Sequence, residues 1–207
     1  MLNQSASPNE APNALLLPWL THEHFLTEKL KSTAGDARLE VLSQRWELAD
    51  DWDCAHLTDV KAQRVLHREI VMWAFDTPCW YARTILPDAT KQANRALFDR
   101  LQTESLGHLI FHGTDITRVS LKSYCVDEQT TEYGWLQPWM HQDATRLWVR
   151  LSEFSVLSHV VPAQAGIHAQ HDHYTSSKMD PRLRGDDNKA SFFLVEILLP
   201  GLMRYLS

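Results

Sequence analysis

Two runs of β-branched and aromatic side chains constrain the fold of this chain more than any other feature. They extend from Val65 to Phe75 and from Cys79 to Leu86, and only Asp76-Thr77-Pro78 lies between them. Runs of this composition are typical of strands, and Asp followed shortly by Pro is typical of a turn. The pattern therefore predicts a β-hairpin.

Other segments of the chain show equally clear periods. Alternating or nearly continuous apolar character predicts strands at 37–48, 116–124, 147–151 and 191–199. A 3.6-residue period predicts a helix from a cap at Thr21 to about Lys31, and a second helix over 88–101. Strands in consecutive hairpins, with helices in separate segments, indicate an α+β fold with an antiparallel sheet. A chain of 207 residues is long enough to bury one sizeable core, so we expect a single domain.

Two segments differ in composition from the rest. Residues 1–13 are rich in Asn, Ser, Pro and Ala and lack an apolar period, which predicts a disordered leader before a domain at 14–207. Residues 158–188 lie between two strands that should pair, yet they contain Gly, Pro, Asp and His instead of alternating apolar residues. Hairpin loops are normally about two to five residues long, so we interpret 158–188 as a disordered insertion.

Charge and hydropathy exclude several classes of function. The net charge of -6 and the scattered Lys and Arg residues oppose binding to nucleic acid. No apolar run approaches the roughly 18 residues that a membrane-spanning helix needs. Residues 1–20 contain no Lys or Arg, so the charged flank of a secretory signal is missing. We therefore expect a soluble, cytoplasmic protein.

Glu196 and Arg83 are the charged residues that the strand pattern singles out. Glu196 is the only charge in the run 191–199, and a buried carboxylate of this kind is often functional. Arg83 lies between Tyr81 and Ile85 on one face of its strand, where its guanidinium requires an anion from a ligand or from a partner such as Glu196. An edge position that reaches water for Glu196, and a structural salt bridge or a solvated face for Arg83, remain open.

A metal site is not expected. His168, His171 and His173 form a His-rich tract beside Asp172, but the tract lies inside the presumed insertion, where no framework would fix the ligands. The eight tryptophans are interpreted as core or lining residues, because base-stacking proteins also need a basic groove.

The order of several motifs resembles the chorismate pyruvate-lyase family. These motifs are HFLTEKL at 24–30, HREIVMWAFDTPCWYARTILP at 67–87, SLGHLIF at 105–111, TDITR at 114–118, LWVR at 147–150 and FFLVEILLP at 192–200. The resemblance implies an antiparallel sheet with helices closing over an internal ligand cavity. This chain departs from the family at Val149, where Gly is usual, at Leu151, where a basic residue is usual, and in the insertion.

The resemblance also implies residue roles. Arg83 would bind the substrate carboxylate, Glu196 would be the catalytic acid, and Leu26 and Leu106 would contact the ligand. The implied reaction converts chorismate to 4-hydroxybenzoate and pyruvate, the first step of ubiquinone ring biosynthesis, in a monomer without metal or organic cofactor. Glu196 would either transfer a proton or only orient the ligand.

Two alternatives remain beside the enzyme. The effector domains of GntR-type regulators resemble this fold, so the chain could be a non-catalytic ligand-binding module; the short leader, which leaves no room for a DNA-binding domain, favours the enzyme. The insertion could also mark an inactive pseudoenzyme.

Overall fold

The computed structural model describes residues 12–57, 60–102, 106–107, 110, 115–141, 143–157 and 189–206. The strands are β1 (Arg38–Leu48), β2 (Arg64–Ala74), β3 (Thr77–Pro87), β4 (Ile116–Asp127), β5 (Arg146–Leu157) and β6 (Lys189–Leu198). The helices are α1 (Leu17–Leu20), α2 (Leu26–Ala34), α3 (Asp51–His56), α4 (Asp88–Ala93), α5 (Arg95–Asp99) and α7 (Pro138–His141), with 3₁₀ turns η1 (Arg100–Gln102), η2 (Tyr133–Trp135) and η4 (Pro200–Tyr205).

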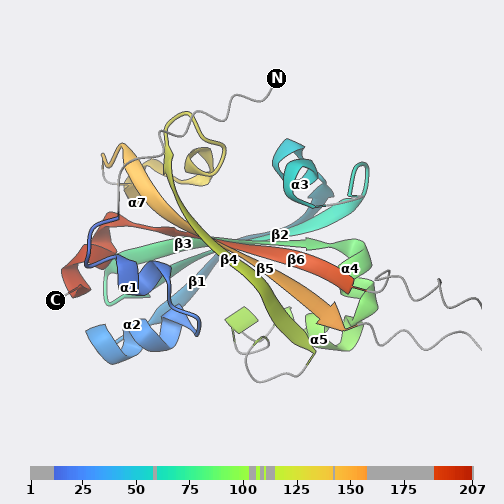
Figure 1. Ribbon diagram of the computed structural model, residues 1–207, viewed down its shortest axis with the longest axis horizontal. Coiled ribbons are helices and arrows are strands. Elements are labelled where there is room, and N and C mark those ends of the chain that lie inside the picture. The colour runs from blue at the N-terminus through green and yellow to red at the C-terminus, as the bar shows by residue number, and fades with distance from the viewer. Residues whose placement is uncertain are drawn as a thin grey trace, which may run out of the picture.

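The strands form one six-stranded sheet in the order β1-β2-β3-β6-β5-β4, and every neighbouring pair is antiparallel (Figure 1). The α+β prediction is therefore confirmed. The last strand in the chain, β6, lies in the middle of the sheet between β3 and β5. This position places its side chains between two neighbouring strands instead of at an edge, and it excludes the edge position that remained open for Glu196.

The two predicted hairpins both form. In the first, β2 pairs with β3 and the turn falls at Phe75 and Asp76, so that Thr77 already pairs with Ala74. Pro78 lies opposite Trp73 at a shift in register, which accommodates a residue that has no N–H to give to the ladder. In the second hairpin, β5 pairs with β6 from Trp148↔Leu198 to Leu157↔Lys189. The presumed insertion at 158–188, like the leader up to residue 11, lies outside the described residues.

The helix predictions are correct in place but not in their ends. Thr21 does not cap the start of a helix; it follows α1, where its hydroxyl donates to the carbonyl of Leu17. The next helix, α2, begins at Leu26 after Phe25, which supplies no side-chain cap. The helix predicted over 88–101 is broken at Asn94, which has φ -143° and accepts a hydrogen bond from the backbone N–H of Leu97. None of the helices in the described ranges is long and apolar enough to cross a membrane.

Helices cover both faces of the sheet (Figure 1). One face packs against α3, η2 and α7 through odd-numbered strand residues such as Tyr81, Val149 and Val195. The opposite face is covered by two separate apolar clusters. The first joins α1, α2 and η4 to residues such as Met72 and Trp80, and the second joins α5 and the residues around Leu106 to the far ends of the same strands. Even-numbered strand residues between these two clusters are therefore left without an apolar cover.

Candidate ligand site

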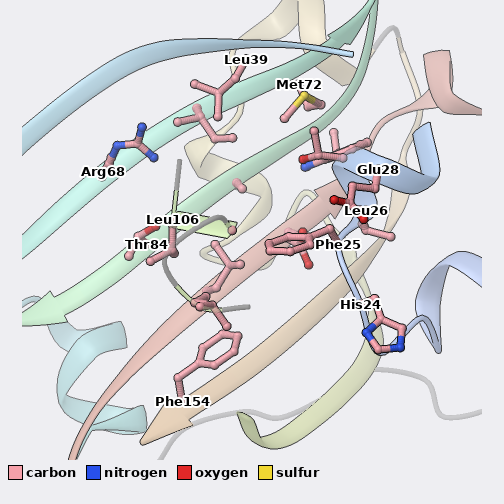
Figure 2. A pocket seen from close by; sticks show the side chains of 18 of the residues that line it. His24, Phe25, Leu26, Glu28, Leu39, Arg68, Met72, Thr84, Leu106 and Phe154 are labelled. Atoms are coloured by element: carbon pink, nitrogen blue, oxygen red, sulfur yellow. The ribbon is translucent and has the colours of Figure 1, made fainter. Parts of the chain in front are cut away.

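A cavity of about 200 Å³ lies on this second face, between the two apolar clusters (Figure 2). A water molecule occupies about 30 Å³ in the liquid, so the cavity has room for a small molecule of roughly one ring and its substituents. Its wall is formed by all six strands, by the N-terminal end of α2 with the two residues before it, and by Leu106, Gly107 and Ile110. The lining residues are His24, Phe25, Leu26, Thr27, Glu28, Leu39, Arg68, Ile70, Met72, Trp80, Ala82, Thr84, Leu106, Gly107, Ile110, Arg118, Phe154, Leu194 and Glu196.

Arg68 is a buried cation in this wall. It projects from β2 opposite Thr84 of β3, and its side chain is only 5% exposed. Burial lowers the pKa of its guanidinium, because removing a charge from water disfavours the charged form. Within the described part of the chain its Nε has no hydrogen-bond partner, and no carboxylate lies at ion-pair distance. A guanidinium in this state is a ready partner for an anionic ligand.

Glu196 lines the same cavity from β6 and is confirmed as a buried carboxylate, 7% exposed. Its Oε2 lies 2.9 Å from Nη1 of Arg150, a residue that is 1% exposed and directly opposite it on β5. The burial of this carboxylate is therefore compensated by a cation, as the low dielectric of the interior requires.

Three sheet side chains hold the loop that leads into the cavity wall. Ser123 Oγ donates to the carbonyl of Leu20, Arg150 Nη2 donates to that of His22, and Arg118 Nη1 donates to that of Glu23. The chain then continues through His24, Phe25 and Leu26, which line the cavity. The sheet therefore fixes this loop close to the carboxylate of Glu196.

Gly107 allows the 106–107 segment to pack closely against Phe25 at the start of α2. A Cβ at this position would overlap the ring of Phe25, so only glycine permits the observed approach between the 106–107 segment and the start of α2.

The structure brings together three of the four site residues that the sequence predicts. Leu26, Leu106 and Glu196 all line the cavity, whereas Arg83 does not. In β3, Ala82 and Thr84 face the cavity, so the alternation of side chains directs Arg83 to the opposite face. Arg83 and Glu196 therefore cannot pair, and Val195 is the β6 residue opposite Arg83. The strand pattern was not used to predict Arg68, Arg118 or Arg150 as site residues, although each is a charged residue within a predicted strand.

Arg83 belongs to a buried polar network on the opposite face. Its Nη2 donates to Nδ1 of His67 at 2.8 Å, because arginine has no acceptor. His67 Nε2 then donates to Oδ2 of Asp53 at 2.9 Å. The Arg83 guanidinium also lies 4.4 Å from the ring centroid of Trp135 and 3.6 Å from Asp50 Oδ2. This network links β2 and β3 to α3, and it gives Arg83 structural partners of its own.

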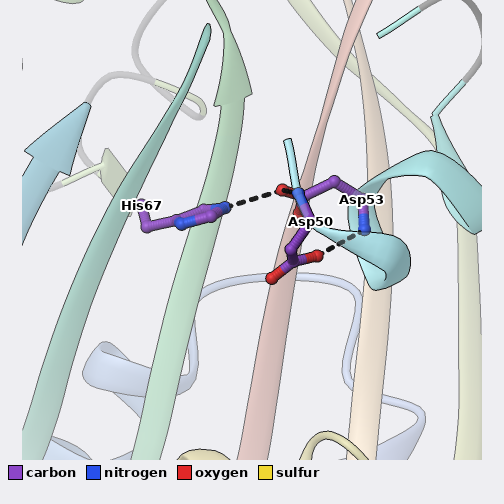
Figure 3. Close-up of side chains that lie close together, drawn as sticks. All are labelled: Asp50, Asp53 and His67. Carbon is purple, nitrogen blue, oxygen red and sulfur yellow. Dashed lines mark hydrogen bonds and ion pairs between the residues drawn. The ribbon is translucent and has the colours of Figure 1, made fainter. Parts of the chain in front are cut away.

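Asp50, Asp53 and His67 have the spacing of a metal-ligand group, since one atom of each lies within 4.8 Å of the others. Figure 3 shows, however, that they already bond to one another. Asp50 Oδ1 accepts from the backbone N–H of Asp53, and Asp53 Oδ2 accepts from that of Asp50, so that the two form a reciprocal cap at the start of α3. With the Arg83 cation bound to the imidazole, this group is better explained as a helix cap than as a cation site.

An antiparallel sheet, one face of which lines a cavity with a buried arginine and a buried carboxylate, defines a single-domain α+β protein with a candidate ligand site. The chain belongs to the chorismate lyase family, whose profile matches residues 2–162. Strand β6 and Glu196 lie beyond the matched residues, so the sheet register, not the profile, places Glu196 in the site.

Similar sequences carry the same family name. The chain is 31% identical over 150 residues to a probable chorismate pyruvate-lyase of Pseudoalteromonas atlantica, covering 69% of this chain and 73% of that protein. It is 29% identical over 126 residues to a probable chorismate pyruvate-lyase of Aromatoleum aromaticum, covering 61% and 68%. Among solved structures, PhnF from Mycobacterium smegmatis matches with a TM-score of 0.47 at 16% identity, covering 85% of this chain and 64% of that one.

Proposed function

We propose that this chain eliminates pyruvate from chorismate to form 4-hydroxybenzoate. The observation that carries the proposal is the buried guanidinium of Arg68, which faces the cavity without an ion-pair partner in the described residues while Glu196 lines the same space. A carboxylate on the ring of the ligand would supply the missing anion. Membership of the chorismate lyase family supports this choice of substrate.

The proposed reaction breaks the ether bond at C3 of the ring and the C–H bond at C4. The electron pair of the C–H bond becomes the third double bond of the aromatic ring, and the ether electrons leave with the enolpyruvyl oxygen. The hydrogen is gained by the methylene carbon of the leaving group, which becomes the methyl group of pyruvate. Since aromatisation drives the reaction, the protein mainly has to orient the ring and stabilise the charge that develops.

We assign the binding of the ring carboxylate to Arg68 instead of Arg83. The guanidinium fork of arginine suits a carboxylate, and Arg68 faces the cavity, whereas Arg83 faces the other side of the sheet and is bound to His67. Phe154, Leu194 and Trp80 provide apolar surface for the ring.

Glu196 is proposed to face the C4 hydroxyl and the ether. Arg150 holds one of its oxygens, so the carboxylate is fixed in direction before a ligand arrives. It could orient the C4 hydroxyl or exchange a proton with the substrate, and the comparison of Gln and Ala substitutions in the Discussion separates these roles.

We further propose that the protein acts as a cytoplasmic monomer in ubiquinone ring biosynthesis and requires neither metal nor organic cofactor. The residues proposed to contact the substrate, Arg68 and Glu196, supply a cation and a carboxylate that are sufficient to bind and orient a carboxylate ligand.

The proposal is tested by incubating the purified protein with chorismate and measuring both products. We expect 4-hydroxybenzoate, followed by absorbance, and pyruvate, followed with a coupled dehydrogenase, in equal amounts. Binding of chorismate without either product would contradict the enzyme and favour a non-catalytic ligand-binding module.

A further inference from the structure

Thr84 is a polar residue in the cavity wall, and no role has been assigned to it. Its side chain projects from β3, directly opposite Arg68 of β2 on the same face of the sheet. Resting on the proposed function, we propose that Thr84 is a further substrate-binding residue, whose hydroxyl donates a hydrogen bond to the ring carboxylate that Arg68 holds. Arg68 would then supply the charge, and Thr84 would supply a separate donor to the same anion.

The hydroxyl of Thr84 is buried beside the cavity without an acceptor in the described part of the chain. The residue is only 3% exposed, and among the described residues no hydrogen bond joins its hydroxyl to another group. Its backbone lies between two paired strands, opposite Arg68 in β2 and Leu194 in β6. Because burying a hydroxyl without an acceptor costs free energy, a ligand group that accepts from Thr84 would stabilise the complex.

Arg68 and Thr84 present their donors to the same space, and Figure 2 shows both side chains at one end of the cavity. Directly opposite residues of an antiparallel pair have Cβ atoms about 4.5 to 5.5 Å apart, so one carboxylate can contact both side chains. A carboxylate offers about four lone-pair positions on its two oxygens. The guanidinium fork of Arg68 occupies two of these positions, which leaves a further position for the hydroxyl of Thr84.

The position of Thr84 also fits the other end of the ligand. Thr84 pairs with Leu194 of β6, and Glu196 is two residues further along that strand, on the same face. Such diagonal neighbours are about 7 to 8 Å apart, a separation that a six-membered ring with substituents on opposite carbons can span. A ligand whose carboxylate contacts Thr84 would therefore present its 4-hydroxyl to Glu196, as the proposed function requires.

Three variants and two ligands test this contact. Thr84→Val removes the hydroxyl and keeps the shape of the side chain, whereas Thr84→Ser keeps the hydroxyl and removes the methyl group. Calorimetry gives the dissociation constants of 4-hydroxybenzoate and of benzoate, which has the carboxylate but lacks the 4-hydroxyl. Thermal unfolding shows whether each variant folds, and Thr84→Ala takes the place of Thr84→Val if the valine variant does not.

Ser152→Ala is the matched control. Ser152 of β5 and Thr84 of β3 lie opposite Leu194 from its two sides, on the same face of the sheet. The hydroxyl of Ser152 is also buried without a hydrogen-bond partner in the described residues, but Ser152 does not line the cavity. The control therefore removes a comparable buried hydroxyl without removing a donor from the ligand.

Thr84→Val is expected to weaken the binding of both ligands by about 10- to 100-fold, the usual effect of one hydrogen bond to a charged group. Thr84→Ser and Ser152→Ala should bind both ligands like the parent. Parental binding in Thr84→Val, or the same loss in Thr84→Ser or Ser152→Ala, would overturn the contact. A loss confined to 4-hydroxybenzoate would show that Thr84 contacts the 4-hydroxyl, and the assignment to the carboxylate would be wrong. These constants need no turnover, so a parent that binds both ligands but releases no pyruvate from chorismate would overturn the proposed function alone.

Discussion

Arg150 and Glu196 form a buried ion pair across β5 and β6, with 2.9 Å between Nη1 and Oε2. The same guanidinium donates through Nη2 to the carbonyl of His22, at 2.6 Å. One side chain thus joins the carboxylate of the candidate site to the loop that leads into the cavity wall. This relationship links the stability of the domain to the geometry of the site.

Arg150→Met is expected to destabilise the protein by about 3 to 5 kcal/mol, because it leaves a buried carboxylate without its cation. The double variant Arg150→Met with Glu196→Gln should recover most of this loss, since the uncompensated charge is gone. Urea denaturation of the parent, of the single variants Arg150→Met and Glu196→Gln, and of the double variant measures the coupling. A double variant as unstable as Arg150→Met would show that the ion pair is not the cause.

Arg68→Met and Arg83→Met both remove an arginine from the same hairpin, but the first should affect ligand binding and the second should affect stability. Arg68→Met should weaken the binding of 4-hydroxybenzoate by about 1.5 to 3 kcal/mol and leave the melting temperature near that of the parent. Arg83→Met should lower stability by about 2 to 4 kcal/mol, because His67 and Asp53 lose a buried partner, and should leave binding nearly unchanged. Calorimetry and thermal unfolding separate the two. If only Arg83→Met loses binding, the ring carboxylate binds to Arg83 and the assignment to Arg68 is wrong.

Glu196→Gln keeps the shape and hydrogen-bonding capacity of the side chain but removes its charge. If Glu196 exchanges a proton with the substrate, kcat should fall by about 100-fold or more, the usual contribution of general acid–base catalysis. If it only orients the C4 hydroxyl, Glu196→Gln should retain most of the activity, and Glu196→Ala should not. Parental turnover in both variants would remove Glu196 from the mechanism.

Chelation is expected to leave turnover unchanged. The group formed by Asp50, Asp53 and His67 lies on the face of the sheet opposite the cavity, and its atoms already cap α3 and bind Arg83. Activity is compared before and after treatment with EDTA and dialysis. An activity that EDTA abolishes and one metal ion restores would require a different mechanism.

Replacing 158–188 with a two-residue Asn-Gly turn should raise the melting temperature and leave kcat unchanged. Leu157 and Lys189 are paired in the β5–β6 ladder, so a short turn can join them without altering the register of Glu196. Shortening a connection by about four doublings in length recovers on the order of 2 kcal/mol of loop entropy. Thermal unfolding and chorismate turnover are compared with the parent; a folded but inactive product would show that the segment takes part in function.

The sequence alone determined where the strands lie, because their signal is local, although β4 and β5 extend three and six residues beyond their predicted ends. Alternation and β-branched residues fixed β1, β2, β3 and β6 to within one or two residues, and an isolated charge in an apolar run was enough to predict that Glu196 is buried. The helix ends were harder to predict. Thr21 has the side chain of a helix cap, but α1 forms immediately before it and uses Thr21 to end that helix instead.

The tertiary structure decided which face of the sheet holds the cavity. Alternation assigns Arg68 to one face of the β2–β3 hairpin and Arg83 to the other, and nothing within the hairpin distinguishes them as ligand sites. That distinction comes from segments distant in the sequence, since α3 fills the face of Arg83, whereas α2 and the residues around Leu106 leave a space over Arg68. The pairing of Arg150 with Glu196 likewise depends on the register between β5 and β6. A periodic pattern gives the direction of each side chain, but only the packing of distant elements decides which of them meet a cavity.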